Sequence, residues 1–359
     1  EDGVKDWPLV TVLMAVYNEE KVIEEKLRSL LGVDYPKAKY QIYIGSDRSS
    51  DQTNAIIERY AAKHTFIHFY PFSQRQGKPG VINSLVEALS KRHSPNANQV
   101  YLMTDASVML EVDCIRQMVR HFKHPEIMMV DSRMVSTGLK TAGISRSESQ
   151  YVSSELRIKY REGLLWGKMI GPFGGCYALR STHYHPVPTN FLVDDFYITM
   201  KAFEQGGLAI HEPKAVCFEA VSHDIREEYR RKSRISAGNF QNLRTFRHCL
   251  RLPFDALGFA FFSHKVLRWL GPFFIIFATL ASGGLWALGH PFYAYVFGLI
   301  LSGLILVPLL DYMCRLGSIH WLLLRNLSYF IIMNVALLAG YVRYRKGIKS
   351  GTWQPTKRE

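Results

Sequence analysis

Three aspartate-bearing segments stand in order along this chain, and a basic run follows them. The segments are residues 45–51 (GSDRSSD), 103–107 (MTDAS) and 193–195 (VDD), and the basic run is residues 230–234 (RRKSR). Carboxylates that follow apolar strands can hold a divalent cation or accept a proton, and clustered arginines can hold a departing diphosphate. This order indicates transfer of a group such as a sugar from an activated nucleotide donor.

Apolar strand-like runs alternate with amphipathic stretches through the first 130 residues. We expect strands at 9–16, 41–46, 66–72, 99–104 and 127–130, and helices at 19–31, 51–64, 77–93 and 111–124. This alternation predicts an α/β domain whose mostly parallel sheet is flanked by helices, with ligands bound beyond the C-terminal ends of the strands. Asp47 and Asp105 both follow such strand ends.

A dinucleotide-binding domain shares this alternation but needs a G-x-G-x-x-G turn after its first strand. Here that turn reads Tyr17-Asn18-Glu19-Glu20, which argues against a dehydrogenase. Asp51 is expected to cap the helix that follows it, because an aspartate before a helix is more often a cap than a ligand.

The order of these motifs resembles that of membrane-bound family 2 glycosyltransferases, of the cellulose, chitin and hyaluronan synthase type. Their catalytic domain has the GT-A nucleotide-sugar-binding fold. The resemblance implies that Tyr17, Asn18 and Glu19 form a nucleotide-base pocket with Asp47, and that Lys78 lies beside the donor phosphates.

The same resemblance assigns the reacting groups. Asp105 matches the first aspartate of a D-x-D motif that binds the donor and its metal ion, and Asp195 matches the general base of an E-D pair, with Asp194 beside it on the acceptor side. Acceptor-facing backbone is implied for Gly174, Gly175 and Cys176, and binding of the donor diphosphate for Arg231 and Arg234.

Two motifs depart from the family pattern. The metal motif reads Asp105-Ala106-Ser107, so Mg²⁺ or Mn²⁺ is expected to rely on one carboxylate, on donor phosphates and on water. The Q-x-x-R-W motif reads Arg231-Lys232-Ser233-Arg234-Ile235, without the tryptophan that stacks under the acceptor sugar in processive enzymes. Processivity is therefore open, and a patch that binds anionic lipid is an alternative role for this basic run.

The second half of the chain has membrane character. No Asp, Glu, Lys or Arg occurs from residue 269 to 310, and a helical span needs about 20 apolar residues. We expect two spans joined near His290-Pro291 and a third at 321–342, where Arg325 snorkels or pairs inside the bundle. The predicted domains are a cytosolic GT-A domain (1–225), interfacial helices (226–269), about three spans (270–342) and a basic tail (343–359).

The net charge of +13 fits a membrane protein with cytosolic basic segments better than it fits a nucleic-acid-binding protein. Residues 226–251 and 343–358 are both basic, so both favour the cytosolic side of the membrane. Three spans would place them on opposite sides, and the topology therefore stays open. Five scattered cysteines indicate a reduced domain with no zinc motif. The chain begins at Glu1, which leaves room for a preceding span.

Three functional readings follow. The first is an inverting, metal-dependent transferase that moves a sugar from a nucleotide-sugar, expected to be a UDP-sugar, to a growing polysaccharide. The second adds one sugar to a lipid-linked acceptor or glycolipid. The third is a non-catalytic membrane subunit, which the retained aspartates disfavour. Three spans make a narrow channel, so polymer export would need further spans, an oligomer or a partner subunit. The sugar and its linkage are not readable from the sequence.

Overall fold

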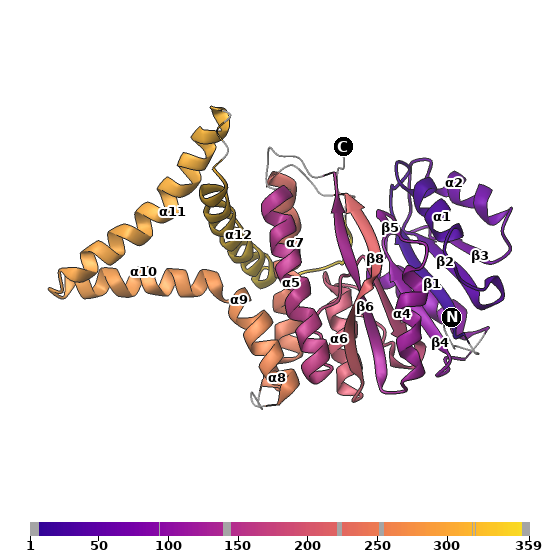
Figure 1. The fold of residues 1–359 in the computed structure, drawn as a ribbon. Coiled ribbons are helices and arrows are strands. Elements are labelled where there is room, and N and C mark those ends of the chain that lie inside the picture. The colour runs from indigo at the N-terminus through magenta and orange to yellow at the C-terminus, as the bar shows by residue number, and fades with distance from the viewer. Residues whose placement is uncertain are drawn as a thin grey trace. The chain divides into compact units, whose positions relative to one another are not determined.

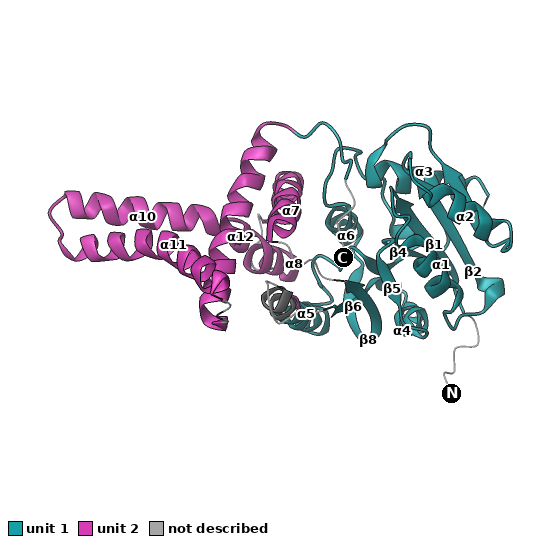
Figure 2. Cartoon of the chain, turned by 90° about the horizontal axis from the view of Figure 1, so that it is seen from above, with its two compact units in different colours: residues 1–138, 153–221, 348–359 teal, residues 139–152, 222–347 magenta. Residues whose placement is uncertain are grey.

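The computed structural model describes residues 7–92, 94–138, 145–220, 225–250, 255–317, 319 and 321–353, with side chains of 145–151 excluded. Two compact units make up the chain (Figure 2). The first comprises Glu1–Gly138, Ser153–Val221 and Ile348–Glu359, and the second comprises Leu139–Val152 and Ser222–Gly347. The beginning of the predicted basic tail thus falls in the second unit and its remainder in the first; its last residues, 354–359, lie outside the described part.

The first unit is built on a sheet with strand order β3-β2-β1-β4-β7-β6-β8-β5 (Figure 1). Four strands at one side are mutually parallel: β1 (Leu9–Val16), β2 (Tyr40–Ser46), β3 (Ile67–Pro71) and β4 (Gln99–Thr104). The other side is mixed, with β5 (Val108–Leu110), β6 (Ile127–Thr137), β7 (Cys176–Arg180) and β8 (Leu208–Ala220). Strand β7 pairs antiparallel with β4 and β6, β8 is parallel to β6, and β5 is antiparallel to β8.

Helices flank this sheet, as the sequence predicted. They are α1 (Ile23–Leu31), α2 (Thr53–Ala61), α3 (Gly77–Ser90), α4 (Cys114–Val119), α5 (Ser145–Trp166) and α6 (Asp194–Glu204). Short 3₁₀ turns occupy Lys37–Lys39, Arg120–Lys123 and Ser181–His183. Seven of the eight residues of β1 are buried because this strand lies inside a covered, parallel part of the sheet, where near-continuous apolar runs are required.

The register of the sheet gathers the candidate residues at one edge. Val16 of β1 pairs with Ser46 of β2, and Ser46 pairs with Pro71 of β3, so the loops after these strands begin side by side. Asp105 follows Thr104 at the end of β4, whose neighbour is Cys176 at the start of β7. Sequence elements far apart along the chain therefore deliver their polar ends to the same edge.

The second unit is helical. Its elements are α7 (Ile225–Thr245), a 3₁₀ turn (Arg247–Leu250), α8 (Ala256–Ala260), a π-helical turn (Phe261–Val266), α9 (Leu267–Trp269), α10 (Gly271–Ala287), α11 (Phe292–Leu316) and α12 (Leu322–Arg345). Helices α7 and α12 pack closely: Ser236 Oγ donates to Leu337 O at 2.7 Å, and Gly340 lies directly against Ser236.

Two helices of the described chain, α11 and α12, are long and apolar enough to cross a membrane. A third span is obtained if Ala256–Trp269 and Gly271–Ala287, which are bent by 59°, count as one. The expected turn at His290-Pro291 separates α10 from α11. Arg325 pairs inside the unit: its Nε lies 3.6 Å from Asp311 Oδ1, and Arg315 holds the other oxygen of Asp311 at 2.9 Å.

Candidate active site

A lysine ammonium lies among the predicted catalytic carboxylates. Lys78, at the start of α3, places Nζ 2.7 Å from Asp105 Oδ1, 4.0 Å from Asp194 Oδ2 and 3.5 Å from Gly174 O. Burial opposes its protonation, but the charges of Asp105 and Asp194 outweigh that effect and raise the pKa of Lys78 above its ordinary value. Lys78 of α3 thus brings together the carboxylates of Asp105, which follows β4, and Asp194 of α6.

Asp195 lies next to this cluster in the first turn of α6, and its Oδ1 accepts the N–H of Phe196 at 2.9 Å. Burial and the neighbouring charge of Asp194 raise the pKa of Asp195 to about 6, although Lys78 pulls in the opposite direction. A carboxylate with such a pKa can accept a proton near neutral pH. The geometry is therefore compatible with the predicted general base.

Glycine is required opposite this base. A Cβ built on Gly174 would lie 2.5 Å from Asp195 Oδ2, and one built on Gly175 would lie 2.7 Å from the ring of Phe173. Gly175 O accepts both the N–H of Asp105 and the hydroxyl of Thr104, each at 3.0 Å. Cys176 has a fully buried side chain, so an acceptor contact at this residue would come from its backbone.

Asp105, the predicted metal ligand, has a side chain that is 39% exposed, and one of its oxygens pairs with the Lys78 ammonium. The described residues contain no group of three or more His, Cys, Asp or Glu side chains that could hold a metal ion among themselves. The donor set therefore fits a cation that takes one carboxylate from the protein and its other oxygens from a diphosphate and water.

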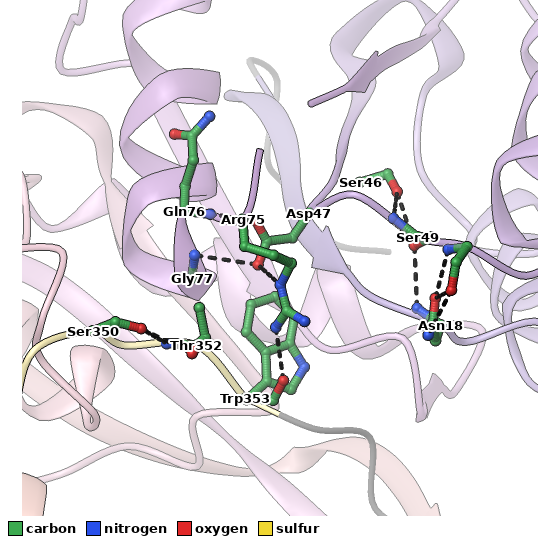
Figure 3. Close-up of polar contacts among 11 residues, drawn as sticks. Asn18, Ser46, Asp47, Ser49, Arg75, Gln76, Gly77, Ser350, Thr352 and Trp353 are labelled. Atoms are coloured by element: carbon green, nitrogen blue, oxygen red, sulfur yellow. Dashed lines mark hydrogen bonds and ion pairs between the residues drawn. The ribbon is translucent and has the colours of Figure 1, made fainter. Parts of the chain in front are cut away.

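Asp47 is fully buried and holds the turn that leads into α3 (Figure 3). Its Oδ1 accepts the N–H of Gln76 at 2.6 Å, and its Oδ2 accepts from Arg75 Nε at 2.9 Å and from the N–H of Gly77 at 3.2 Å. Asp47 therefore shapes the loop that carries Lys78. Its predicted contact with a nucleotide base stays a prediction.

Two residues that the sequence reasoning missed lie beside Asp47. The guanidinium of Arg75 lies 3.4 Å from the ring centroid of Tyr17 and donates to Trp353 O at 2.8 Å. The Trp353 ring lies 6.2 Å from the Tyr17 ring, at 74° to it. These rings and the guanidinium offer flat surfaces of the kind on which nucleotide bases stack.

The segment that carries Trp353 is anchored to the first unit by its backbone. Gly351 N donates to Thr189 O at 2.9 Å, and Ile348 O accepts from Asn190 Nδ2 at 3.3 Å. Gly77, whose φ is +75°, meets the backbone of Gly351. A lone tryptophan in an otherwise polar and basic tail was the sequence signal for this contact.

Asn18 and Glu19 join the loops after β1 and β2. Asn18, whose φ is +53°, donates its N–H to Ser49 Oγ at 3.1 Å, and its Oδ1 accepts the N–H of Ser50 at 2.8 Å. Glu19 N donates to Thr53 Oγ1 at 2.8 Å. These bonds hold the loop that presents Tyr17, and the predicted contacts of Asn18 and Glu19 with a nucleotide are untested.

Arg231 and Arg234 belong to α7 of the second unit. Arg231 Nε lies 3.1 Å from Glu228 Oε2, and Lys232 Nζ lies 3.2 Å from the other oxygen of this buried glutamate. Their predicted role in holding the diphosphate stays a prediction.

Two family models match this chain. The model described as "Glycosyl transferase family 2" matches residues 11–184, and the one described as "Glycosyl transferase family group 2" matches residues 100–342. The second match covers more than half of the chain.

Individual proteins give the same picture. A probable glycosyltransferase, YdaM, of Bacillus subtilis is 23% identical over 94% of this chain and 75% of its own length. A poly-β-1,6-N-acetyl-D-glucosamine synthase of Staphylococcus aureus is 24% identical over 73% of this chain, and that match spans 64% of the synthase. A solved mannosyltransferase of Pyrobaculum calidifontis, in complex with GDP-Man and Mn²⁺, has a TM-score of 0.67 and 21% identity, over 95% of this chain and 88% of its own. This last likeness shows the fold.

Proposed function

The chain belongs to glycosyltransferase family 2, as its motifs predicted, and from this we propose its reaction. We propose that it transfers a hexosyl or N-acetylhexosaminyl group from a UDP-sugar to a growing polysaccharide. The transfer inverts the configuration at the anomeric carbon. The observation that carries this proposal is the approach of Lys78 to Asp105 and Asp194, beside Asp195. A fixed cation next to a carboxylate with a raised pKa is the arrangement that this displacement needs.

The reaction is a single displacement. The acceptor hydroxyl oxygen forms a bond to the anomeric carbon while its proton passes to Asp195, and the bond between that carbon and the diphosphate oxygen breaks, its electron pair leaving with the nucleoside diphosphate. Lys78 stabilises the negative charge that grows on the diphosphate. A divalent cation, when held by Asp105 and the diphosphate, supplies further neutralisation of that charge.

The donor site in this proposal is the surface formed by Tyr17, Arg75 and Trp353. The base stacks on these flat groups, the phosphates extend toward Lys78 and Asp105, and the acceptor approaches over Gly174 toward Asp195. Support comes from the order of these residues along one sheet edge and from the polar contacts that hold each loop.

A second candidate is addition of one sugar to a lipid-linked acceptor. It is favoured by Ile235, which stands where processive family members carry the tryptophan that stacks under the acceptor. The two candidates share every step at Asp195 and differ in how often the acceptor is extended.

The deciding experiment incubates the protein in nanodiscs with Mg²⁺ or Mn²⁺ and a panel of UDP- and GDP-sugars. Released nucleoside diphosphate is measured and the product is sized. A ladder from one donor supports polysaccharide synthesis, and a single-sugar lipid product supports the second candidate. If no nucleoside diphosphate is released with any donor, with and without lipid extract, both proposed functions are wrong.

A further inference from the structure

A second buried charge cluster lies under the acceptor side of the site and takes no part in the proposed displacement. Asp131 of β6 is fully buried, and its neighbours Lys159 of α5 and His211 of β8 are 5% and 6% exposed. Asp131 Oδ2 lies 3.2 Å from Lys159 Nζ and 3.0 Å from His211 Nδ1. All three residues belong to the first unit.

The other oxygen of Asp131 holds backbone. Its Oδ1 accepts the N–H of Phe173 at 2.6 Å, and the next residue along, Gly174, is the one that contacts Asp195. Neighbouring bonds act on the same segment: Ser132 Oγ donates to Cys176 O at 2.6 Å, and Glu162 Oε2 accepts the N–H of Ile170 at 3.3 Å. Three buried side chains thus hold the backbone of residues 170–176 by hydrogen bonds.

The position of this segment matters because Gly174 lies very close to the Asp195 carboxylate. A Cβ built on Gly174 would lie 2.5 Å from Asp195 Oδ2, so there is no room for a methyl group between this backbone and the carboxylate. Buried polar networks of this kind rigidify the backbone they satisfy, and misplacement of a reacting group by about 1 Å can reduce a rate about 100-fold.

We propose that Asp131 is a positioning residue for the general base: through its bond to the N–H of Phe173 it holds Gly174 against Asp195, while Lys159 and His211 fix the orientation of its carboxylate. This inference rests on the proposed role of Asp195. Although burial opposes ionisation, Lys159 and His211 lower the pKa of Asp131, so that both of its oxygens remain acceptors.

The test uses two double variants in which both charges are removed, one that keeps an acceptor for the N–H of Phe173 and one that lacks it. Asp131→Asn with Lys159→Met removes both charges and keeps an oxygen that can accept from Phe173. Asp131→Leu with Lys159→Met removes both charges and that acceptor. We expect the first to keep kcat within about threefold of the parent and the second to lose about 100-fold in kcat, with UDP affinity unchanged in both.

A matched control separates positioning from general stability. Glu212 is a carboxylate on β8 next to His211, 6% exposed, held by Arg120 at 2.8 Å and His121 at 2.6 Å. The described contacts of its side chain do not include the 170–176 segment. Glu212→Gln should therefore lower the thermal midpoint as the double variants do and leave kcat unchanged.

If the Asp131→Leu double variant does not fold, Asp131→Ser in the same Lys159→Met background replaces it, because a serine hydroxyl is one bond too short to reach Phe173 N. Equal kcat for the variant with the acceptor and the variant without it would overturn the inference. Asp195→Asn is assayed in parallel. If Asp195→Asn retains turnover, the proposed base itself is wrong; if it is inactive while the double variants match, only the positioning role fails.

Discussion

Lys78 Nζ lies 2.7 Å from Asp105 Oδ1, and this ion pair joins the first turn of α3 to the end of β4 at the candidate donor site. Lys78 Nζ also lies 4.0 Å from Asp194 Oδ2. The positive charge of Lys78 and the negative charges of the two aspartates are therefore in place where a diphosphate would depart. Because these residues are already in contact with one another, single substitutions can test what each of them contributes to sugar transfer.

Replacement of the proposed base tests the displacement directly. Asp195→Asn keeps the shape of the side chain but removes its ability to accept the acceptor proton, and general bases contribute roughly 10²- to 10⁴-fold in rate. We expect kcat to fall within that range while the dissociation constant for UDP stays within about twofold. Loss of UDP binding together with activity would contradict the assigned role.

The pH dependence follows from the pKa of Asp195, which is raised to about 6 by burial and by Asp194. The base must be ionised, so kcat/KM should rise with pH up to about 6 and level off above it. Asp194→Asn removes the like charge that raises this pKa, and the acidic limb should then move to lower pH. An acidic limb that does not move would show that another group controls it.

Asp105→Ala tests the cation site. The variant lacks the carboxylate that pairs with Lys78 and that would hold a divalent cation, so the Mg²⁺- or Mn²⁺-dependent part of UDP binding should disappear. Calorimetric titration of UDP with the metal and with excess EDTA measures that difference. A metal dependence equal to that of the parent would rule out Asp105 as the ligand.

Gly174→Ala places a methyl group about where Asp195 Oδ2 now lies, since the built Cβ would be 2.5 Å from that oxygen. The base or the acceptor segment must shift, and turnover should fall about 100-fold with little change in UDP affinity. Gly298→Ala in α11, where no atom lies within 4 Å of the built Cβ, is the control. Similar turnover in both variants would show that the contact at Gly174 is tolerated.

Trp353→Ala removes the aromatic surface beside Tyr17 and Arg75. If a base stacks there, the dissociation constant for UDP should rise by about one order of magnitude, which is the lower range for loss of one base–aromatic stack. The exposed Lys349→Ala in the same segment serves as control. Unchanged affinity in Trp353→Ala would move the base site away from the tail.

The sequence predicted the parallel half of the fold well. Strands β1, β2 and β4 are almost entirely buried and read as apolar runs, and the edge strand β3 lies between two clear helical stretches. The pattern of apolar runs did not predict β5 or β8. The residues of β8 alternate in burial, and β8 pairs with β6 across the long helix α5. Strand β7 was expected only through the family resemblance of residues 174–178. Strand β6 is longer than predicted, since its second half pairs with β8 beyond the buried run.

The candidate site was predictable where a motif carries the chemistry. Lys78, Asp105, Asp194 and Asp195 are named by short motifs, and the structure brings them together. The lone tryptophan of the tail is a sequence signal, but its partner Arg75 was not predictable, because their contact joins residues separated by 278 positions and depends on where the tail packs. Asp131 likewise looks like an ordinary strand residue until the N–H of Phe173 is seen to bind it.

The anchoring of Gly351 to Thr189 limits the number of times that the chain can cross a membrane between these residues. Residues 153–220 and 348–353 belong to one folded unit and so lie in one aqueous compartment. A chain that leaves a compartment and returns to it crosses the intervening bilayer an even number of times. Helices α11 and α12 satisfy the length and hydropathy requirements on their own and are enough to supply such a pair. Both basic segments then share one side, which removes the conflict in their charges.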